Sequence, residues 1–183
     1  MERSLLVGGF GGQGVMVIGQ LLCYTTCEET DKYVTFFPSY GSEQRGGTAN
    51  CYVVISDEPI GAPITAKMDD VMVLNDPSMI RFEAMVKPGG CLIVNETIVS
   101  VAPKRDDITI INVPANKIAD EIGDARVANL AMVGAYIGFT DLLPADKVLA
   151  TAFRRLGAKR PQLNPLNEAA FNKGLEIGKA AKG

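Results

Sequence analysis

The feature that most constrains the fold is a glycine-rich stretch near the amino terminus. An apolar run at residues 5–7 is followed by five glycines within residues 8–14, and an apolar segment begins at Val15. This order predicts a strand, a tight turn and a helix, and Gly9, Gly11 and Gly14 have the spacing of the dinucleotide-binding fingerprint. Glycine permits positive φ and close approach of a ligand, and the amides that open a helix favour an anion. The alternative is a close-packed turn that binds nothing.

The composition predicts one ordinary globular domain that covers residues 1–183. The chain is 47% hydrophobic and 21% charged, and its length is sufficient for a sizeable core. A net charge of −3 with scattered basic residues does not support nucleic-acid binding. No signal-peptide pattern precedes the first strand, and the longest apolar stretch, residues 127–139, is too short to span a bilayer. We therefore expect a cytoplasmic protein.

The reactive residue types limit the chemistry that this chain can perform. Histidine is absent, which excludes Ser-His-Asp and Cys-His catalysis and His-ligated metals. The cysteines do not have the Cys-x-x-Cys spacing of metal or redox sites, so buried thiols are favoured over a metal or a disulfide. They are Cys23, Cys27, Cys51 and Cys91. The sequence thus predicts no catalytic residue and no metal site in the chain alone.

Hydrophobic patterning predicts alternating strands and helices. Strands are expected at residues 5–7, 33–37, 49–56, 71–74, 91–94 and 108–113, and helices at 13–30, 76–86, 115–122, 125–143, 144–156 and from 164 onwards. Pro38 is expected to stop the second strand. Asp76 is expected to cap the second helix, with Pro77 at its first position, and Asn164 to cap the last one. The pattern indicates an α/β fold: a single three-layer domain with a mixed, mostly parallel sheet and a helical C-terminal third.

The last two long helical segments carry different packing signals. The segment at 125–143 is almost entirely apolar, which predicts a central, covered helix. On the final helix, a stripe of mostly small residues predicts close packing on a neighbour in the same chain or another. The stripe consists of Leu166, Ala170, Gly174, Ile177 and Ala181. Residues 179–183 are expected to fray.

A nicotinamide cofactor is disfavoured by the second strand. Such enzymes need a carboxylate at the end of that strand to bind the ribose hydroxyls. Here the strand ends Phe36-Phe37-Pro38, while Asp31 precedes it and Glu43 follows only in a loop. An NAD-dependent oxidoreductase is therefore the weakest of the alternatives.

The loop after the second strand is the other candidate for binding. In it, Glu43 and Arg45 flank Gln44, and Gly46 follows. Arginine suits a phosphate or carboxylate, and glycine lets the chain pass close to a ligand or partner. The alternative is an internal Glu43–Arg45 pair that braces the loop.

Further polar residues follow other strands. Asn75 and Asp76 come after the fourth strand and Asn95 and Glu96 after the fifth, so all four could line the edge of the sheet at which the glycine turn lies. Capping explains Asp76 adequately. The pair at residues 159–160 is interpreted as a solvated basic face.

Two motifs together resemble the γ subunit of 2-oxoacid:ferredoxin oxidoreductases. They are the glycine stretch at residues 8–14 and the segment at 38–48, Pro-Ser-Tyr-Gly-Ser-Glu-Gln-Arg-Gly-Gly-Thr. Residues 75–77 and 88–95 also match, and the likeness covers essentially the whole chain. Residues 129–135 and 164–168 are most similar to the 2-oxoglutarate and branched-chain members.

The resemblance implies a subunit of a larger enzyme. The family oxidatively decarboxylates a 2-oxoacid to an acyl-CoA and passes electrons to ferredoxin. The resemblance places thiamine diphosphate in the α and β subunits and 4Fe-4S clusters in β and in a ferredoxin-like δ subunit. It also implies that the γ domain packs against the catalytic subunits. The isolated chain could form a homodimer.

The same resemblance implies that this chain helps to bind coenzyme A. The family-motif positions are Gly11, Gly12, Gln13, Gly14, Glu43, Arg45 and Gly46. A glycine turn at a helix N-terminus together with Arg45 suits CoA phosphates. The alternatives are a subunit of indolepyruvate oxidoreductase with the same fold, or a stand-alone nucleotide- or CoA-binding protein.

Overall fold

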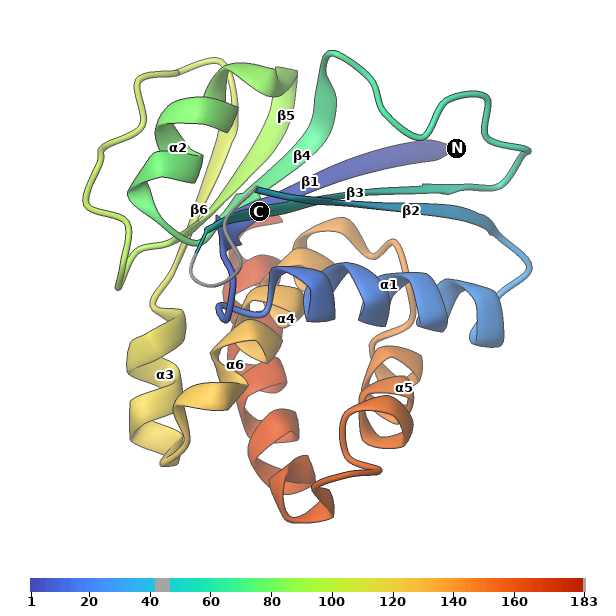
Figure 1. Ribbon diagram of the computed structural model, residues 1–183, viewed down its shortest axis with the longest axis vertical. Helices are drawn as coiled ribbons and strands as arrows, with labels where there is room; N and C mark the ends of the chain where they lie inside the picture. Colours follow the sequence, from blue (N-terminus) through green and yellow to red (C-terminus); the bar gives the residue numbers. More distant parts are fainter. Residues whose placement is uncertain (42–46, 183) are drawn as a thin grey trace.

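The computed structural model describes residues 1–41 and 47–182, and in these ranges a six-stranded sheet lies between two layers of helices (Figure 1). The strands are β1 (Glu2–Phe10), β2 (Tyr33–Tyr40), β3 (Thr48–Ser56), β4 (Met68–Val73), β5 (Val86–Asn95) and β6 (Thr109–Val113), in the order β2-β3-β1-β4-β5-β6. Strand β3 is antiparallel to β1 and β2, whereas β1, β4, β5 and β6 run parallel. The predicted α/β class with a mixed, mostly parallel sheet is confirmed.

The two faces of the sheet are covered unequally (Figure 1). One face carries α1 (Val15–Glu29), α3 (Ala115–Ile122), α4 (Ala128–Thr140), α5 (Ala145–Arg155) and α6 (Asn164–Lys182); the other carries α2 (Asp76–Phe82). Alternate residues of β1 separate the two cores: Leu5 and Val7 pack beneath the five helices, while Leu6 packs with Met79 and Phe82. The third layer is therefore thin, and the main core lies between the sheet and the C-terminal helices.

Pro38 does not end the second strand, contrary to the sequence prediction. β2 continues through Pro38 to Tyr40, and Pro38 is paired in register with Cys51 of β3. β2 is an edge strand of the sheet, where a residue without an N–H group is tolerated. The sequence alone did not reveal that this strand lies at the edge.

The second helix is shorter than predicted and is capped by a different residue. Asn75 is the N-cap, because its side chain accepts a hydrogen bond from the Ser78 N–H. Asp76 is the first helical residue, and Pro77 follows it. After α2, a 3₁₀ turn (Glu83–Met85) leads directly into β5. The predicted helix to residue 86 is thus wrong.

Strand β5 begins five residues earlier than predicted because Lys87-Pro-Gly-Gly90 passes close to β4. A Cβ atom on Gly90 would lie 2.4 Å from the Asp69 carbonyl oxygen, so only glycine fits this close approach. The register between β4 and β5 shifts between Met68 and Asp70 at the same point. Because the first residues of β5 include a proline and two glycines, which are typical of turns, the sequence pattern did not predict this part of the strand.

Helices α4 and α6 touch backbone to backbone through glycines of both. A Cβ on Gly174 would lie 1.9 Å from the Ala131 carbonyl oxygen, and one on Gly134 would lie 2.1 Å from the Phe171 carbonyl oxygen. The neighbour that the small residues of the final helix predicted is therefore α4 of the same chain. The predicted stripe is partly wrong, since Ala181 is exposed and the fully buried side includes Phe171.

The ends of the last helix also differ from the prediction. Asn164 is not a cap, since a 3₁₀ turn (Pro161–Leu163) leads directly into α6 and Asn164 is already helical. At the other end, the helix continues through Lys182 where fraying was expected. The apolar helix predicted within 125–143 is confirmed as α4, whose residues 130–138 are all buried. In the described parts of the chain, no helix is both long and apolar enough to cross a bilayer.

The cysteines are only partly buried as expected. Cys51 and Cys91 are buried, Cys23 is half-buried, and Cys27 is exposed. Burial raises the pKa of the Cys51 thiol to about 12 and that of Cys23 to about 11. These thiols stay protonated at neutral pH and are poor metal ligands.

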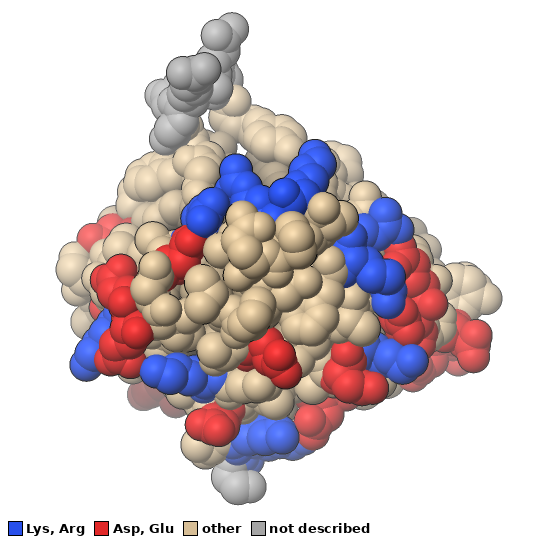
Figure 2. All heavy atoms as spheres, turned by 90° about the horizontal axis from the view of Figure 1, so that it is seen from below, with Lys and Arg blue, Asp and Glu red and all other residues tan. Residues whose placement is uncertain are grey.

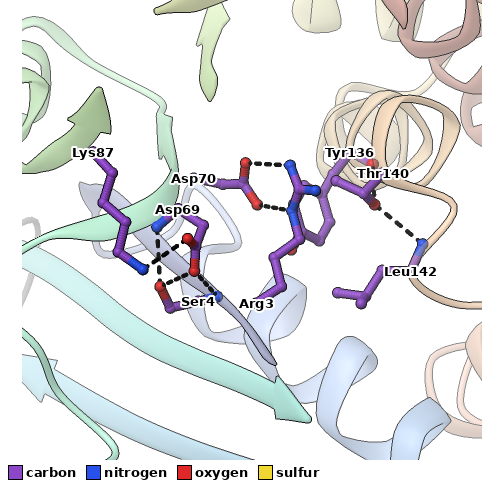
Figure 3. Close-up of polar contacts among 8 residues, drawn as sticks. All are labelled: Arg3, Ser4, Asp69, Asp70, Lys87, Tyr136, Thr140 and Leu142. Atoms are coloured by element: carbon purple, nitrogen blue, oxygen red, sulfur yellow. Dashed lines mark hydrogen bonds and ion pairs between the residues drawn. The ribbon is translucent and has the colours of Figure 1, made fainter. Parts of the chain in front are cut away.

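Two polar networks join β1 to β4 at the end of the sheet opposite the glycine turn (Figure 3). The Arg3 guanidinium donates to both oxygens of Asp70, with Nε–Oδ2 at 2.6 Å and Nη2–Oδ1 at 2.8 Å. Beside it, Asp69 accepts from Ser4 and Lys87. Asp70 is completely buried, so burial raises the pKa of its carboxyl group even beside Arg3. Arg3 therefore compensates a charge that has no access to water.

Replacing Arg3 with methionine should leave the Asp70 carboxylate buried without a counter-charge. We expect the free energy of unfolding to fall by about 3–5 kcal/mol near pH 7. A raised folded-state carboxyl pKa contributes stability at low pH that is lost as the pH rises through it. The deficit of Arg3→Met should therefore narrow towards about pH 5, as measured by urea denaturation.

Two control variants make this test specific. Arg81→Met changes an exposed arginine on α2 and should have little effect. Arg3→Met combined with Asp70→Leu should recover most of the stability, because the buried charge is gone. A deficit in Arg3→Met that does not change with pH would contradict the role of Asp70.

Candidate functional site

The chain changes face between two neighbouring parallel strands, and this creates a crevice. After β1 the chain enters α1 on the helix-rich face, whereas after β4 it enters α2 on the opposite face (Figure 1). In open α/β sheets, ligands bind outside the carboxyl ends of strands at such a switch point. The glycine turn lies at this place.

Two glycines of the turn have backbone angles that favour glycine. Gly12 has φ of 97° and Gly14 has φ of 85°. Gly14 is the N-cap of α1, has no side chain to cap the helix, and no acidic residue lies in the first turn. The first amides of α1 therefore lack a side-chain acceptor, which suits an anionic guest. Gly8 and Gly9 belong to β1 and not to the turn.

The Gln13 side chain holds the turn against the sheet. Its Oε1 accepts from the Phe10 N–H at 2.7 Å and from Asn75 Nδ2 at 3.1 Å, and its Nε2 donates to the Leu74 carbonyl at 2.9 Å. The Gln13 amide thus connects the ends of β1 and β4. Its role in the structure is to brace the site.

A cavity of about 460 Å³ opens beside the turn. This volume lies in the usual range of small-molecule sites. Its walls come from the turn after β1, the ends of β4 and β5, the start of α3 and the start of α4. The lining includes Gly12, Gln13, Gly14, Leu74, Asn95, Asn116, Arg126, Asn129 and Met132.

Three asparagines, Asn95, Asn116 and Asn129, line this cavity. Asn95 ends β5 and is only 4% exposed. Its Nδ2 donates to Asn116 Oδ1 of α3 at 2.8 Å. The Oδ1 atoms of Asn95 and of Asn129 are buried without a protein partner. Because Gly14 has no Cβ, the Asn129 side chain can lie directly against the turn.

Among the described residues that line the cavity, Arg126 is the basic one. Arg126 donates to Asp124 through Nε and Nη2, and this pairing lowers the pKa of the Asp124 carboxyl group to about 2. Arg160 adds a second positive charge near Asp124. On the helix-covered side of the molecule, one group of Lys and Arg side chains lies near the upper edge of the view, and others lie among acidic side chains around the rest of the outline (Figure 2). Arg160, interpreted from sequence as part of a solvated face, is near Asp124 but is not among the residues that line the cavity.

The structure brings together several of the predicted binding residues. Gly12, Gln13 and Gly14 line the cavity. Gly11 lies beside them, and its N–H donates to the Gly47 carbonyl at 3.0 Å, so the turn contacts the end of the second predicted loop. The predicted residues Glu43, Arg45 and Gly46 lie outside the described residues.

The other polar candidates at this edge have different roles. Asn95 lines the cavity as expected, and Asn75 contacts Gln13. Asp76 instead accepts from the Ser100 backbone and hydroxyl. Asp76 and Glu96 are not among the residues that line the cavity.

Sequence reasoning missed Asn116, Arg126 and the role of Asn129. Each lies at the start of a helical segment, and none of the three was predicted to line a site. The missing signal was spatial, because α3 and α4 begin next to the glycine turn only after folding. Among the described residues, no group of three or more His, Cys, Asp and Glu side chains could hold a metal ion.

Residues 4–177 match the protein family described as pyruvate ferredoxin/flavodoxin oxidoreductase. Two relatives illustrate the range of names. The 2-oxoglutarate synthase subunit KorC of Methanocaldococcus jannaschii is 32% identical over 181 residues, covering 98% of this chain and 95% of KorC. The ketoisovalerate oxidoreductase subunit VorA of Methanothermobacter marburgensis is 40% identical over 143 residues, covering 77% of this chain but only 30% of VorA.

Two solved structures have the same fold. The γ subunit of a keto/oxoacid ferredoxin oxidoreductase from Geobacter sulfurreducens superposes with a TM-score of 0.85 at 23% identity, covering all of this chain and 99% of that one. A 2-oxoglutarate:ferredoxin oxidoreductase from Magnetococcus marinus, solved with 2-oxoglutarate, coenzyme A and succinyl-CoA, gives 0.88 at 21% identity. There the match covers 98% of this chain and 31% of the larger chain. The sequence resemblance to γ subunits is confirmed.

Replacing Gln13 with alanine should loosen the turn. The change leaves the Phe10 N–H and the Leu74 carbonyl without their side-chain partner, which should lower the free energy of unfolding by about 1–3 kcal/mol. Exchange of the Phe10 amide hydrogen should accelerate as well. Gln20→Ala, an exposed change on the same α1 helix, is the matched control. Equal stability of the two variants would contradict the bracing role.

Proposed function

The chain belongs to the pyruvate ferredoxin/flavodoxin oxidoreductase family, and from this we propose that it works as the γ subunit of a 2-oxoacid:ferredoxin oxidoreductase complex. The complex would decarboxylate a 2-oxoacid oxidatively, form an acyl-CoA and pass the electrons to ferredoxin. Support comes from KorC, which is a subunit of 2-oxoglutarate synthase and aligns along nearly its whole length.

In this proposal the reacting groups are in partner subunits. Thiamine diphosphate would be held by α and β subunits, and 4Fe-4S clusters by β and by a ferredoxin-like δ subunit. The chain itself has no histidine. The γ chain would then provide a binding surface and part of a substrate site.

The substrate for which the γ chain provides part of the site is coenzyme A. The observation that carries this proposal is the cavity of about 460 Å³ beside the glycine turn, whose lining includes both the start of α1 and Arg126. Helix N-terminal amides and arginine suit the phosphates of CoA. The solved Magnetococcus marinus enzyme contains coenzyme A, which supports this choice of ligand. Arg45 is proposed to contribute from its loop.

The names of the relatives suggest three candidates for the 2-oxoacid substrate. KorC is named for 2-oxoglutarate, VorA for ketoisovalerate, and a Thermococcus kodakarensis γ subunit for both pyruvate and ketoisovalerate. We favour 2-oxoglutarate because the KorC match covers both chains almost fully. An indolepyruvate oxidoreductase subunit is the alternative within this fold. A cytoplasmic location stays a prediction.

A stand-alone nucleotide- or CoA-binding protein is the alternative from a different class. It would use the same cavity but need no partner. A nicotinamide enzyme is less compatible, since the described lining residues include no carboxylate for the ribose hydroxyls. The experiment below separates these functions.

Reconstitution with α, β and δ subunits tests the proposal. We expect no 2-oxoacid-dependent ferredoxin reduction by the chain alone and CoA-dependent activity once the partners are added. Arg45→Ala should raise the KM for CoA about tenfold or more, because a charge-assisted contact to phosphate is lost, with little change in the KM for the 2-oxoacid.

Arg81→Ala on α2 is the matched control and should leave the KM for CoA unchanged. Oxidation of a hydroxyacid with NAD by the chain alone would overturn the subunit function. CoA kinetics in Arg45→Ala equal to those of the wild type would reduce Arg45 to a brace of its loop.

A further inference from the structure

The three asparagines of the cavity have hydrogen-bonding capacity that the protein itself does not use. Asn95 is 4% exposed, and its Oδ1 has no protein partner. Asn129 Oδ1 is buried in the same wall and is also unpartnered. Buried amide oxygens are nearly always hydrogen-bonded in folded proteins. Two such oxygens at one cavity therefore point to a ligand that donates hydrogen bonds.

We propose that Asn95, Asn116 and Asn129 form a recognition element for a planar edge of the ligand that carries an N–H donor beside an acceptor. The inference rests on the proposed CoA function and identifies which part of the ligand this wall contacts. Adenine has such an edge, whereas a trans secondary amide of pantetheine presents its N–H and its C=O on opposite sides. The start of α1 and Arg126 would bind the anionic groups of the ligand.

The donor–acceptor pairing does not depend on how the amide groups are oriented. Asn95 Nδ2 donates to Asn116 Oδ1 at 2.8 Å, so the amide oxygen of Asn95 and the amide NH2 group of Asn116 take no part in this bond. If both amides were rotated by 180°, the bond would run the other way. One donor and one acceptor would again remain. The pair is complementary to an edge that offers both.

The position of Asn129 joins this edge to the glycine turn. A Cβ on Gly14 would lie 2.7 Å from Asn129 Nδ2, so the side chain occupies the space that this glycine leaves free. The neutral amide of Asn129 therefore lies beside the positive start of α1. Such a site suits a ligand in which an uncharged hydrogen-bonding group is linked to phosphate, and both halves of CoA have this character.

The charge of the lining residues supports an uncharged contact at this wall. Among the described residues that line the cavity, Arg126 carries a full charge, and it already pairs with Asp124. The asparagines are neutral and lie on β5, α3 and α4. Selectivity at this wall would then come from hydrogen-bond geometry, because a site built for a hydrogen-bonding group discriminates strongly against analogues that lack it.

Titration calorimetry on the reconstituted complex tests the inference with four probes. They are CoA, adenosine 3′,5′-bisphosphate (adenine without pantetheine), 4′-phosphopantetheine (amides without adenine) and pyrophosphate (neither). The variants are Asn95→Ser and Asn129→Ala, with the exposed Asn172→Ala of α6 as the matched control. Thermal denaturation of each variant checks that it is folded.

We expect both cavity variants to weaken CoA binding about 5- to 100-fold, while pyrophosphate binding stays within about twofold and Asn172→Ala behaves as wild type. Weakened binding of adenosine 3′,5′-bisphosphate would identify adenine as the group recognised. Weakened binding of 4′-phosphopantetheine with unchanged binding of adenosine 3′,5′-bisphosphate would overturn the inference, because a trans amide does not offer a donor beside an acceptor on one edge.

Binding of CoA to both folded variants within about twofold of wild type would overturn the inference and leave the proposed function intact. If Asn95→Ser fails to fold, Asn129→Ala decides alone. Absence of CoA binding by the wild-type complex would overturn the proposed function, and this inference with it.

Discussion

The candidate site depends on the Gln13 amide, which ties the glycine turn to the ends of two parallel strands. Its three hydrogen bonds reach Phe10, Leu74 and Asn75. Without a brace, a turn with positive φ at Gly12 and Gly14 would have few internal contacts to fix it. With the brace, the start of α1 is fixed over the crevice between β1 and β4.

Helix α4 extends from the cavity to the opposite end of the sheet. Its first turn provides Asn129, while Tyr136, two turns later, lies beside the Arg3–Asp70 pair (Figure 3). The glycine contacts with α6 leave no space for larger side chains between the two helices. Helix α4 thus extends from the wall of the cavity to the partly buried Arg3–Asp70 pair.

The sequence predicted the architecture because its strongest signals are local. The glycine spacing, the apolar segment that became α4 and the alternation of short strands with helices each depend on neighbouring residues. The errors in the predicted strand end and helix cap arose where the outcome depends on residues distant in the sequence or on a choice between two suitable neighbours. Pro38 was taken as a strand end because edge position depends on the whole sheet, and Asp76 was preferred to Asn75 as a cap although both residue types suit that role.

The candidate site was predictable only where it is continuous in the chain. Gly14 was identified from the glycine spacing, and Gly12 and Gln13 from the resemblance to γ subunits, whereas Asn116 and Arg126 belong to segments that meet the turn only in the folded protein. The resemblance to γ subunits provided the ligand, since glycines and amides do not specify CoA by themselves. The identity of the ligand therefore came from the family resemblance, and the arrangement of the site came from the structure.

The most direct test is a crystal structure of the assembled complex with CoA bound. We predict that CoA lies against the Gly12–Gly14 turn, with a phosphate near the start of α1 or Arg126 and an N–H donor within hydrogen-bond distance of Asn95 or Asn129. CoA bound at full occupancy elsewhere, with no atom in the cavity beside the turn, would contradict the role assigned to this edge of the sheet.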